Sequence, residues 1–90
     1  MMHVRYIYLS PHFLKRWNAL SGEMQHRSQK AIDLFRGNPF HPSLRLHRLK
    51  GKMRMYWSIS IDRGNRIVFR LDGDKAYFSS IGSHAIYEQP

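Results

Sequence analysis

The sequence predicts an α+β domain, in which an antiparallel sheet carries a hairpin of two helices on one face. Three observations lead to this fold class. An extended segment opens the chain, two amphipathic stretches at helical spacing follow it, and four short segments with strand character complete it. Consecutive strands joined by tight turns pair antiparallel, so the expected element order is βααββββ with a four-strand meander. The two helices would cover one face of the sheet and leave the other free for function.

The first strand and both helices are marked by local signals. Residues 4–9 are β-branched and aromatic, which favours extended backbone. Ser10 can cap the amides at a helix start and Pro11 suits the first helical position, so a helix should begin here and end near residue 21. A second amphipathic helix is predicted over residues 23–36.

The remaining strands are read from alternation and turn residues. A loop with two prolines precedes them, and the predicted strands are 44–49, 56–61, 66–71 and 75–81. The turn residues Asp62–Asn65 join the second and third of these into a β-hairpin. Alternation in this hairpin places Arg66 and Arg70 together on one face of the sheet, and this face also carries serines. A surface of this composition is suited to an anion.

The totals point to one soluble domain. Ninety residues form a single core, so residues 1–90 are expected to fold as one unit. No segment approaches the roughly 18 apolar residues that span a bilayer, and the first ten residues lack a signal-peptide pattern, so we expect a cytoplasmic protein with no membrane partner. The chain has no cysteine, and no pair of its six histidines has the helical spacing of a zinc site. We therefore expect no metal and no other cofactor.

The charge balance is strongly basic. The chain has 15 Lys and Arg against 6 Asp and Glu, which gives a formal net charge of +9. A small domain with this charge attracts polyanions, so nucleic acid or an acidic protein is the predicted partner, and a generally basic surface is the alternative. The residues expected to contact phosphate are Arg45, Arg48, Lys50, Lys52, Arg54 and Arg70.

The basic half of the chain also contains groups suited to acid–base chemistry. RNA cleavage needs a base on the 2′-hydroxyl, an acid on the leaving 5′-oxygen, and cations near the phosphorane charge. An imidazole beside phosphate-binding arginines can serve as the base or the acid. Candidates for these roles are His47, Lys50, Arg66, Arg70, His84 and Tyr87. For Tyr87 the alternative is a structural role, packing the end of the chain against the sheet.

Several segments occur in a characteristic order. NPF follows the second predicted helix, and LRLHRLKG, YWSISIDRGNRIVFR and a closing IGSHAIY come after it. This combination, over nearly the whole chain, resembles the RelE/ParE superfamily of small bacterial toxins from type II toxin–antitoxin systems. The resemblance implies an mRNA interferase, an endoribonuclease that cuts mRNA, usually in the ribosomal A site. It also implies a cognate antitoxin that holds the toxin inactive in a heterotetramer or higher complex.

The resemblance assigns roles to four residues. His47 and His84 stand where YafQ-like toxins carry catalytic histidines, and Tyr87 lies near the position of their aromatic residue. Arg66 matches the arginine of the RelE and YoeB branch. The resemblance therefore implies that these four side chains form the catalytic set.

The chain departs from the family pattern on one strand. RelE-type enzymes carry lysines at about the positions of Ser58 and Ser60, and YafQ-type enzymes carry a histidine near Ser60. The ParE branch poisons DNA gyrase and generally lacks a histidine and a tyrosine near the end. The alternatives to a ribonuclease are therefore a gyrase inhibitor, an inactivated toxin that only binds its antitoxin, and a plain nucleic-acid-binding module.

Overall fold

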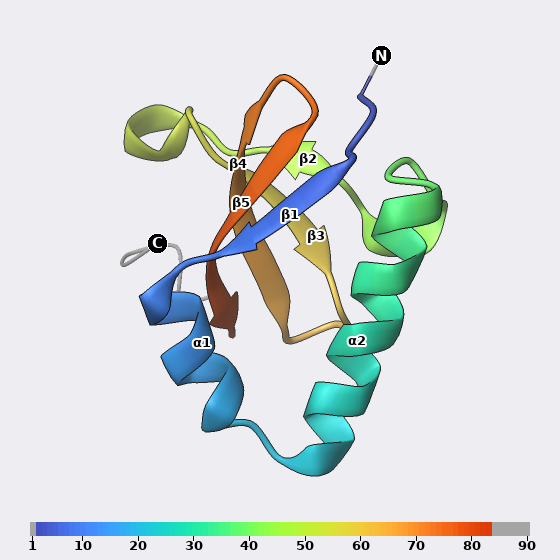
Figure 1. Ribbon diagram of the computed structural model, residues 1–90, viewed down its shortest axis with the longest axis vertical. Coiled ribbons are helices and arrows are strands. Elements are labelled where there is room, and N and C mark those ends of the chain that lie inside the picture. Colours follow the sequence, from blue (N-terminus) through green and yellow to red (C-terminus); the bar gives the residue numbers. More distant parts are fainter. Residues whose placement is uncertain (1, 84–90) are drawn as a thin grey trace.

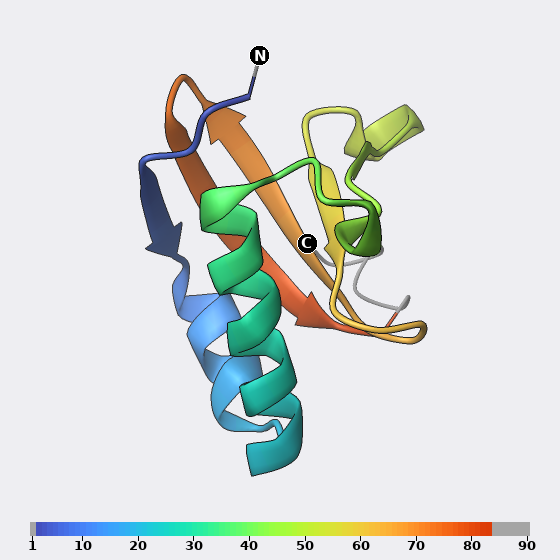
Figure 2. The same cartoon turned by 90° about the vertical axis from the view of Figure 1, so that its right-hand side faces the viewer.

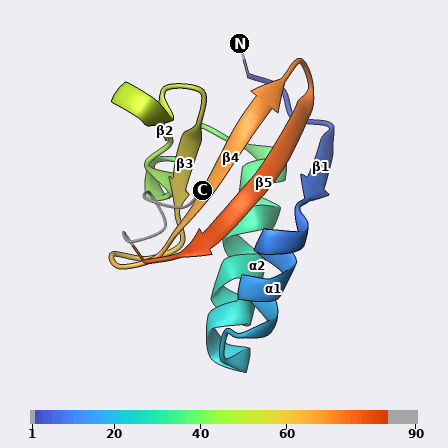
Figure 3. The ribbon, with the colours of Figure 1, turned by 90° about the vertical axis from the view of Figure 1, so that its left-hand side faces the viewer.

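The computed structural model describes residues 2–83, which form one layer of helices against one five-stranded sheet (Figure 1). The elements in chain order are β1 (Tyr6–Leu9), α1 (Pro11–Asn18), α2 (Gly22–Gly37), the 3-10 helix η1 (Pro42–Leu44), β2 (His47–Arg48), the 3-10 helix η2 (Gly51–Met53), β3 (Trp57–Ser60), β4 (Arg66–Asp72) and β5 (Lys75–Gly82). Figures 2 and 3 view the molecule from opposite sides, with α2 in front of the sheet in the first and behind β4 and β5 in the second. The helices thus cover one face of the sheet, and within residues 2–83 no helix is long and apolar enough to cross a membrane.

The sheet has the strand order β1-β5-β4-β3-β2. The predicted α+β class and the βααββββ order are confirmed, and the four later strands pair antiparallel as expected. The sheet is nevertheless mixed, because β1 runs parallel to β5. No tight turn connects these two strands, and the long intervening chain, which includes both helices, allows the parallel pairing.

Both helices begin where the sequence predicts. The Ser10 hydroxyl accepts a hydrogen bond from the Phe13 amide at 3.0 Å, and it donates to the Ser79 carbonyl at 3.0 Å. The Ser21 hydroxyl accepts from the Met24 amide at 3.1 Å in the same way at the start of α2. The cap of α1 therefore also ties this helix to β5, which fixes one end of the helical layer on the sheet.

The core lies between the helices and the sheet. It is centred on four phenylalanines, Phe13, Phe35, Phe69 and Phe78, each no more than 1% exposed. Phe35 reaches both strands, with its ring centroid 5.1 Å from that of Phe69 and 5.9 Å from that of Phe78. Such edge and tilted contacts add to the burial of each ring. The apolar residues of β3, β4 and β5 that face this layer include Ile59, Ile67 and Ile81, whereas Val68 points to the other face.

The segment after α2 differs from the prediction. A strand over residues 44–49 was expected from its alternation, but the strand β2 comprises only His47–Arg48. Pro42–Leu44 forms a 3-10 turn that buries Leu44 to 1% exposure. Arg45 then takes a left-handed conformation with φ of 45°, which cannot continue a strand. The strand therefore starts only after this turn.

Candidate nucleic-acid interface

The residues that the sequence predicts for RNA chemistry include several on the sheet face turned away from the helices. Ile59 and Ile67 pack into the helix-covered core, so the residues that alternate with them face the other side. We call this surface the open face. Its members on β2, β3 and β4 are His47, Ser58, Ser60, Arg66, Val68 and Arg70. The prediction that Arg66 and Arg70 share a face with the two serines is confirmed.

His47 stands at one end of the open face. It pairs with Ser58 across the β2–β3 ladder and its side chain is exposed. Its Nδ1 lies 3.1 Å from the Arg45 carbonyl oxygen. A carbonyl only accepts, so the bond requires the proton on Nδ1, which leaves Nε2 of the neutral imidazole as a proton acceptor. The carbonyl of Arg45, in its left-handed turn, therefore fixes the orientation of the His47 ring.

Arg66 stands on the other side of β3. It pairs with Ser60, and its Nη1 donates a hydrogen bond to the Ser60 hydroxyl. The Arg66 Nε is buried and has no hydrogen-bond partner among the residues that the structure describes. A buried donor without a partner is destabilising by about 1–3 kcal/mol. Ser60 thus holds the guanidinium in place through Nη1, while Nε stays out of contact with solvent.

The pairing register fixes how far apart these two groups are. His47 pairs with Ser58 and Arg66 pairs with Ser60, so the two residues flank β3 and are offset by two residues along it. Ordinary sheet spacings then separate their Cα atoms by about 12 Å. Both side chains are long and lie on the same face, so they can approach one phosphate group from two sides.

Three buried residues form the middle of the open face. Ser58, Val68 and Ser80 follow one another across β3, β4 and β5, and each is 0% exposed. The Ser80 hydroxyl has no hydrogen-bond partner within residues 2–83. At Ser58 and Ser60 the chain therefore presents no exposed basic group, in contrast to the lysine or histidine that the resemblance leads one to expect there.

The basic stretch that follows η1 is divided between surfaces. Its five members, Arg45, Arg48, Lys50, Lys52 and Arg54, are all exposed. Arg48 pairs with Trp57, a residue of the helix-covered face, so it lies on the side opposite His47. Its Nε donates to the Arg54 carbonyl at 2.7 Å, which stabilises the connection between β2 and β3. The structure therefore does not bring Arg48 to His47.

Arg70 forms a second basic point on the open face. It is exposed, and its guanidinium carbon lies 5.9 Å from the centroid of the Tyr77 ring, a cation–π contact. Arg70 follows Arg66 by four positions along the strand, which is a distance of about 13 Å. The two arginines therefore mark two positions along β4 and do not form one clamp.

The hairpin turn that precedes Arg66 is organised by Asp62. Its carboxylate accepts hydrogen bonds from the Gly64 amide at 2.9 Å, the Asn65 amide at 2.9 Å and the Asn65 side chain at 3.0 Å. Burial alone would raise the pKa of Asp62, but these hydrogen bonds, together with Arg27 at 3.6 Å, lower the pKa below its ordinary value. The charged carboxylate thus holds the turn that sets Arg66 opposite Ser60.

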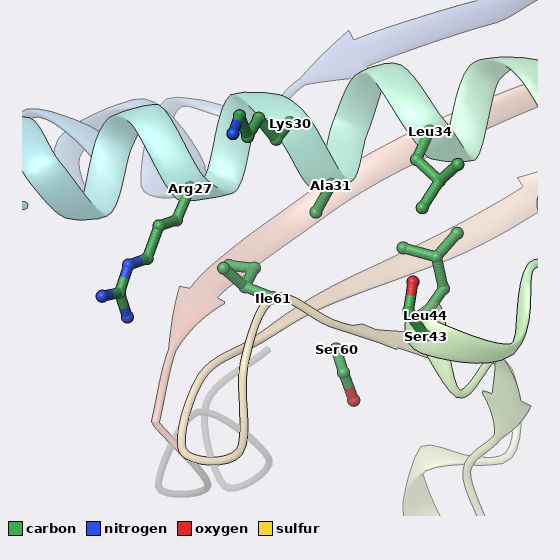
Figure 4. A pocket seen from close by; sticks show the side chains of 8 residues that line it. All are labelled: Arg27, Lys30, Ala31, Leu34, Ser43, Leu44, Ser60 and Ile61. Atoms are coloured by element: carbon green, nitrogen blue, oxygen red, sulfur yellow. The ribbon is translucent and has the colours of Figure 1, made fainter.

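A hollow of about 240 Å³ lies at the edge of the sheet, between α2, η1 and the end of β3 (Figure 4). Figure 4 shows Leu34 and Leu44 pointing toward one another, while the Ser60 hydroxyl is directed away from α2. The walls of the hollow are largely apolar, and Arg27 and Lys30 lie at its rim. The hollow lacks the acid–base pair that cleavage needs, so it is not the candidate catalytic centre.

Two of the predicted catalytic residues cannot be placed. His84 and Tyr87 lie outside the residues that the structure describes. Of the predicted catalytic set, the structure therefore locates His47 and Arg66. Within residues 2–83, no three histidine or carboxylate side chains gather as a metal site would require.

One feature of the open face was missed from the sequence. Tyr8 of β1 and Tyr77 of β5 stack with their ring centroids 5.2 Å apart. The alternation of aromatic residues in each strand was visible, but their pairing depends on the parallel register of β1 with β5. Only the folded sheet shows that the two rings meet.

The folded chain resembles several solved toxin structures. YafQ from E. coli strain BL21(DE3) matches with a TM-score of 0.73 and 17% identity, over 90% of this chain and 94% of that chain. A YoeB/ParE toxin from Agrobacterium tumefaciens matches with a TM-score of 0.71 and 21% identity, over 89% and 99%. The E. coli DinJ–YafQ toxin–antitoxin complex matches with a TM-score of 0.69 and 18% identity, over 88% and 91%. At these identities the likeness establishes the fold.

The family is established by sequence. No curated protein sequence gives a significant match to the chain. The model of the ParE-like toxin domain, however, matches residues 22–89, which is well over half of the chain. It extends from the start of α2 through the open face to the segment that contains His84 and Tyr87. Together with the fold, this match identifies the chain as a member of the ParE-like toxin family, within the RelE/ParE superfamily of toxins.

Proposed function

We propose that this protein is the toxin component of a type II toxin–antitoxin system and an mRNA endoribonuclease that works by general acid–base catalysis. The observation that carries the proposal is that His47 and Arg66 both lie on the open face of the sheet, on opposite sides of β3. The net charge of +9 supports a polyanionic substrate. Family membership supports the role as a toxin.

The proposed cleavage reaction follows from the orientations of His47 and Arg66. The Nε2 of His47 takes the proton of the 2′-hydroxyl, and the 2′-oxygen attacks the phosphorus. Arg66 donates hydrogen bonds to the phosphate oxygens, on which negative charge increases as the new bond forms. The bond to the 5′-oxygen then breaks, which leaves a 2′,3′-cyclic phosphate and a 5′-hydroxyl. The resemblance implies that His84 and Tyr87 also belong to the catalytic set, and in this scheme His84 supplies the proton to the 5′-oxygen.

The proposed partners are a cognate antitoxin and ribosome-bound mRNA. One structural relative is YafQ in the DinJ–YafQ toxin–antitoxin complex. A protein of the same fold that carries +9 is suited to an antitoxin with an acidic segment, in a heterotetramer or higher complex. The exposed side chains Arg45, Lys50 and Lys52 would contact the phosphates of RNA without taking part in the reaction.

The test is cleavage of a defined mRNA on purified ribosomes, followed at single turnover with the full-length toxin. His47→Ala is expected to lower the cleavage rate about 100-fold or more, since it removes the base. The matched control is His26→Ala, because His26 is an exposed histidine of α2 in the helical layer. Absence of cleavage by the native chain, or full cleavage by the His47→Ala variant, would refute the mechanism.

A second candidate function is supported by one observation. Ser58 and Ser60 are buried and uncharged at positions where ribonuclease relatives carry basic residues. A gyrase inhibitor, or an inactivated toxin that only binds its antitoxin, would not need them. Inhibition of DNA supercoiling by purified gyrase, without mRNA cleavage, would select the gyrase inhibitor. Antitoxin binding without either effect would select the inactivated toxin, and salt-sensitive RNA binding without turnover would select a plain nucleic-acid-binding module.

A further inference from the structure

The open face ends, at the β1 edge, in a row of aromatic and basic side chains. The strand registers place Tyr8 opposite Tyr77 and Tyr77 opposite Arg70. The two rings are stacked, with centroids 5.2 Å apart and planes inclined by 18°. The Arg70 guanidinium carbon lies 5.9 Å from the Tyr77 ring centroid, so the row runs across three strands. We call these three residues the tyrosine platform.

The platform is open to solvent. Tyr8 is 46% exposed, and Arg70 is exposed as well. β1 is the edge strand of the sheet, so within residues 2–83 no further strand lies beyond Tyr8 on the side away from Tyr77. Tyr6 lies on the same face two residues earlier and is 52% exposed. Side chains of this size that remain half exposed contribute little to the core, so their position calls for another account.

A shallow hollow of about 520 Å³ adjoins the platform. It is lined by Met55, Arg70, Leu71, Asp72 and Tyr77. Its apolar members offer a surface for a flat ring, and Met55 is 62% exposed at its rim. Lys75 pairs with Asp72 across the β4–β5 ladder, so a basic residue also stands beside the acidic residue of this hollow.

We propose that the tyrosine platform binds an unpaired base of single-stranded RNA, next to the phosphate that His47 and Arg66 engage. The inference rests on the proposed function, since it concerns the same face and the same substrate. Aromatic rings beside an arginine suit a base that has left its stack, because the ring takes the base and the cation takes a phosphate. The net charge of +9 favours this occupant. Arg70 of the platform follows Arg66 by four positions along β4, about 13 Å, which a short RNA strand can span, although Val68 between them is buried.

The experiment uses RNA that cannot be cleaved. A fluorescent 2′-O-methyl RNA octamer lacks the attacking hydroxyl, and a second octamer has the same backbone but no bases. Tyr8→Leu and Tyr77→Leu are each expected to weaken binding of the base-bearing octamer about tenfold or more, with no change for the abasic octamer. Tyr8→Phe keeps the ring and should bind as the native chain does. Phe40→Leu is the matched control, because Phe40 is 52% exposed in the loop after α2, away from the platform.

The outcomes separate the platform from the proposed catalysis. Equal affinity of the native chain for both octamers, or unchanged binding by both leucine variants, overturns the platform. Leucine variants that retain RNA binding but no longer bind the antitoxin also overturn it and assign this surface to the protein partner. Base-dependent binding that the leucine variants lose supports the platform even where the native chain cleaves no mRNA, because this assay involves no cleavage. Thermal unfolding of each variant confirms that it is folded.

Discussion

The two faces of the sheet use alternate residues of the same strands for different purposes. On the helix-covered face Ile59, Ile67, Phe69 and Phe78 are each 0% exposed and pack against the helices. On the open face the strands carry a histidine, arginines, tyrosines and serines, and several of these have unsatisfied or solvent-exposed groups. Position parity along a strand therefore separates the core positions from the candidate ligand-binding positions, although Ser58, Val68 and Ser80 on the open face are buried as well. Three predictions test this separation.

The largest effect is expected on the helix-covered face. Phe69→Ala removes a fully buried ring that contacts Phe35 and Phe78, so it should lower the free energy of unfolding by about 3–5 kcal/mol. Its neighbour Arg70 faces the other way, and Arg70→Ala should change the free energy of unfolding by about 0.5 kcal/mol or less. Urea denaturation of both variants measures the difference. Similar losses in the two variants would show that the faces are not energetically distinct.

The second effect is expected on the open face. Arg66→Ala should lower the rate of mRNA cleavage about 100-fold, since the developing phosphate charge loses its donor. Arg66→Lys keeps the charge but not the planar fork, so its rate should lie between those of the native chain and the alanine variant. Arg63→Ala is the control, because Arg63 is an exposed arginine in the adjacent turn. If Arg63→Ala slows cleavage as much as Arg66→Ala, the effect comes from general charge.

The smallest effect concerns the turn that joins β3 to β4. The pKa of Asp62 is lower in the folded chain than in the unfolded chain, where it is about 3.9. The charged carboxylate therefore stabilises the fold fully at pH values above the unfolded pKa. This contribution is lost as the pH falls through the lowered pKa of the folded chain. Asp62→Asn should therefore be about 1 kcal/mol or less destabilised at pH 7, and should approach the native chain at about pH 3. Urea denaturation at both pH values measures this. A difference that does not shrink in acid would contradict the assignment.

Local signals predicted much of the fold. Ser10 caps α1 as expected, because a cap depends only on residues within one turn, and Ser21 caps α2 in the same way although only the start of that helix was predicted. Alternation correctly placed Arg66 and Arg70 on one face. The alternation of residues 44–49 was misleading, since it shows no sign that Arg45 adopts a left-handed conformation.

Long-range features could not be predicted in the same way. The parallel pairing of β1 with β5 joins residues such as Tyr6 and Lys75, and no local pattern encodes their register. The stacking of Tyr8 on Tyr77 depends on that register, so it escaped notice for the same physical reason. His47 was identified from its residue type and neighbours, but its orientation comes from the Arg45 carbonyl, which only the folded turn supplies.

The position of β5 between β1 and β4 has a consequence for the order of folding. β5 pairs with β4 through a tight turn, but it also pairs with β1, which lies at the other end of the described chain. Contacts between residues so far apart in the sequence close a long loop, and the entropic cost of that loop delays them. We therefore expect β1 to dock after the hairpins β3–β4 and β4–β5 have formed, so that one edge of β5 stays unpaired for part of folding and is then open to pairing with other chains.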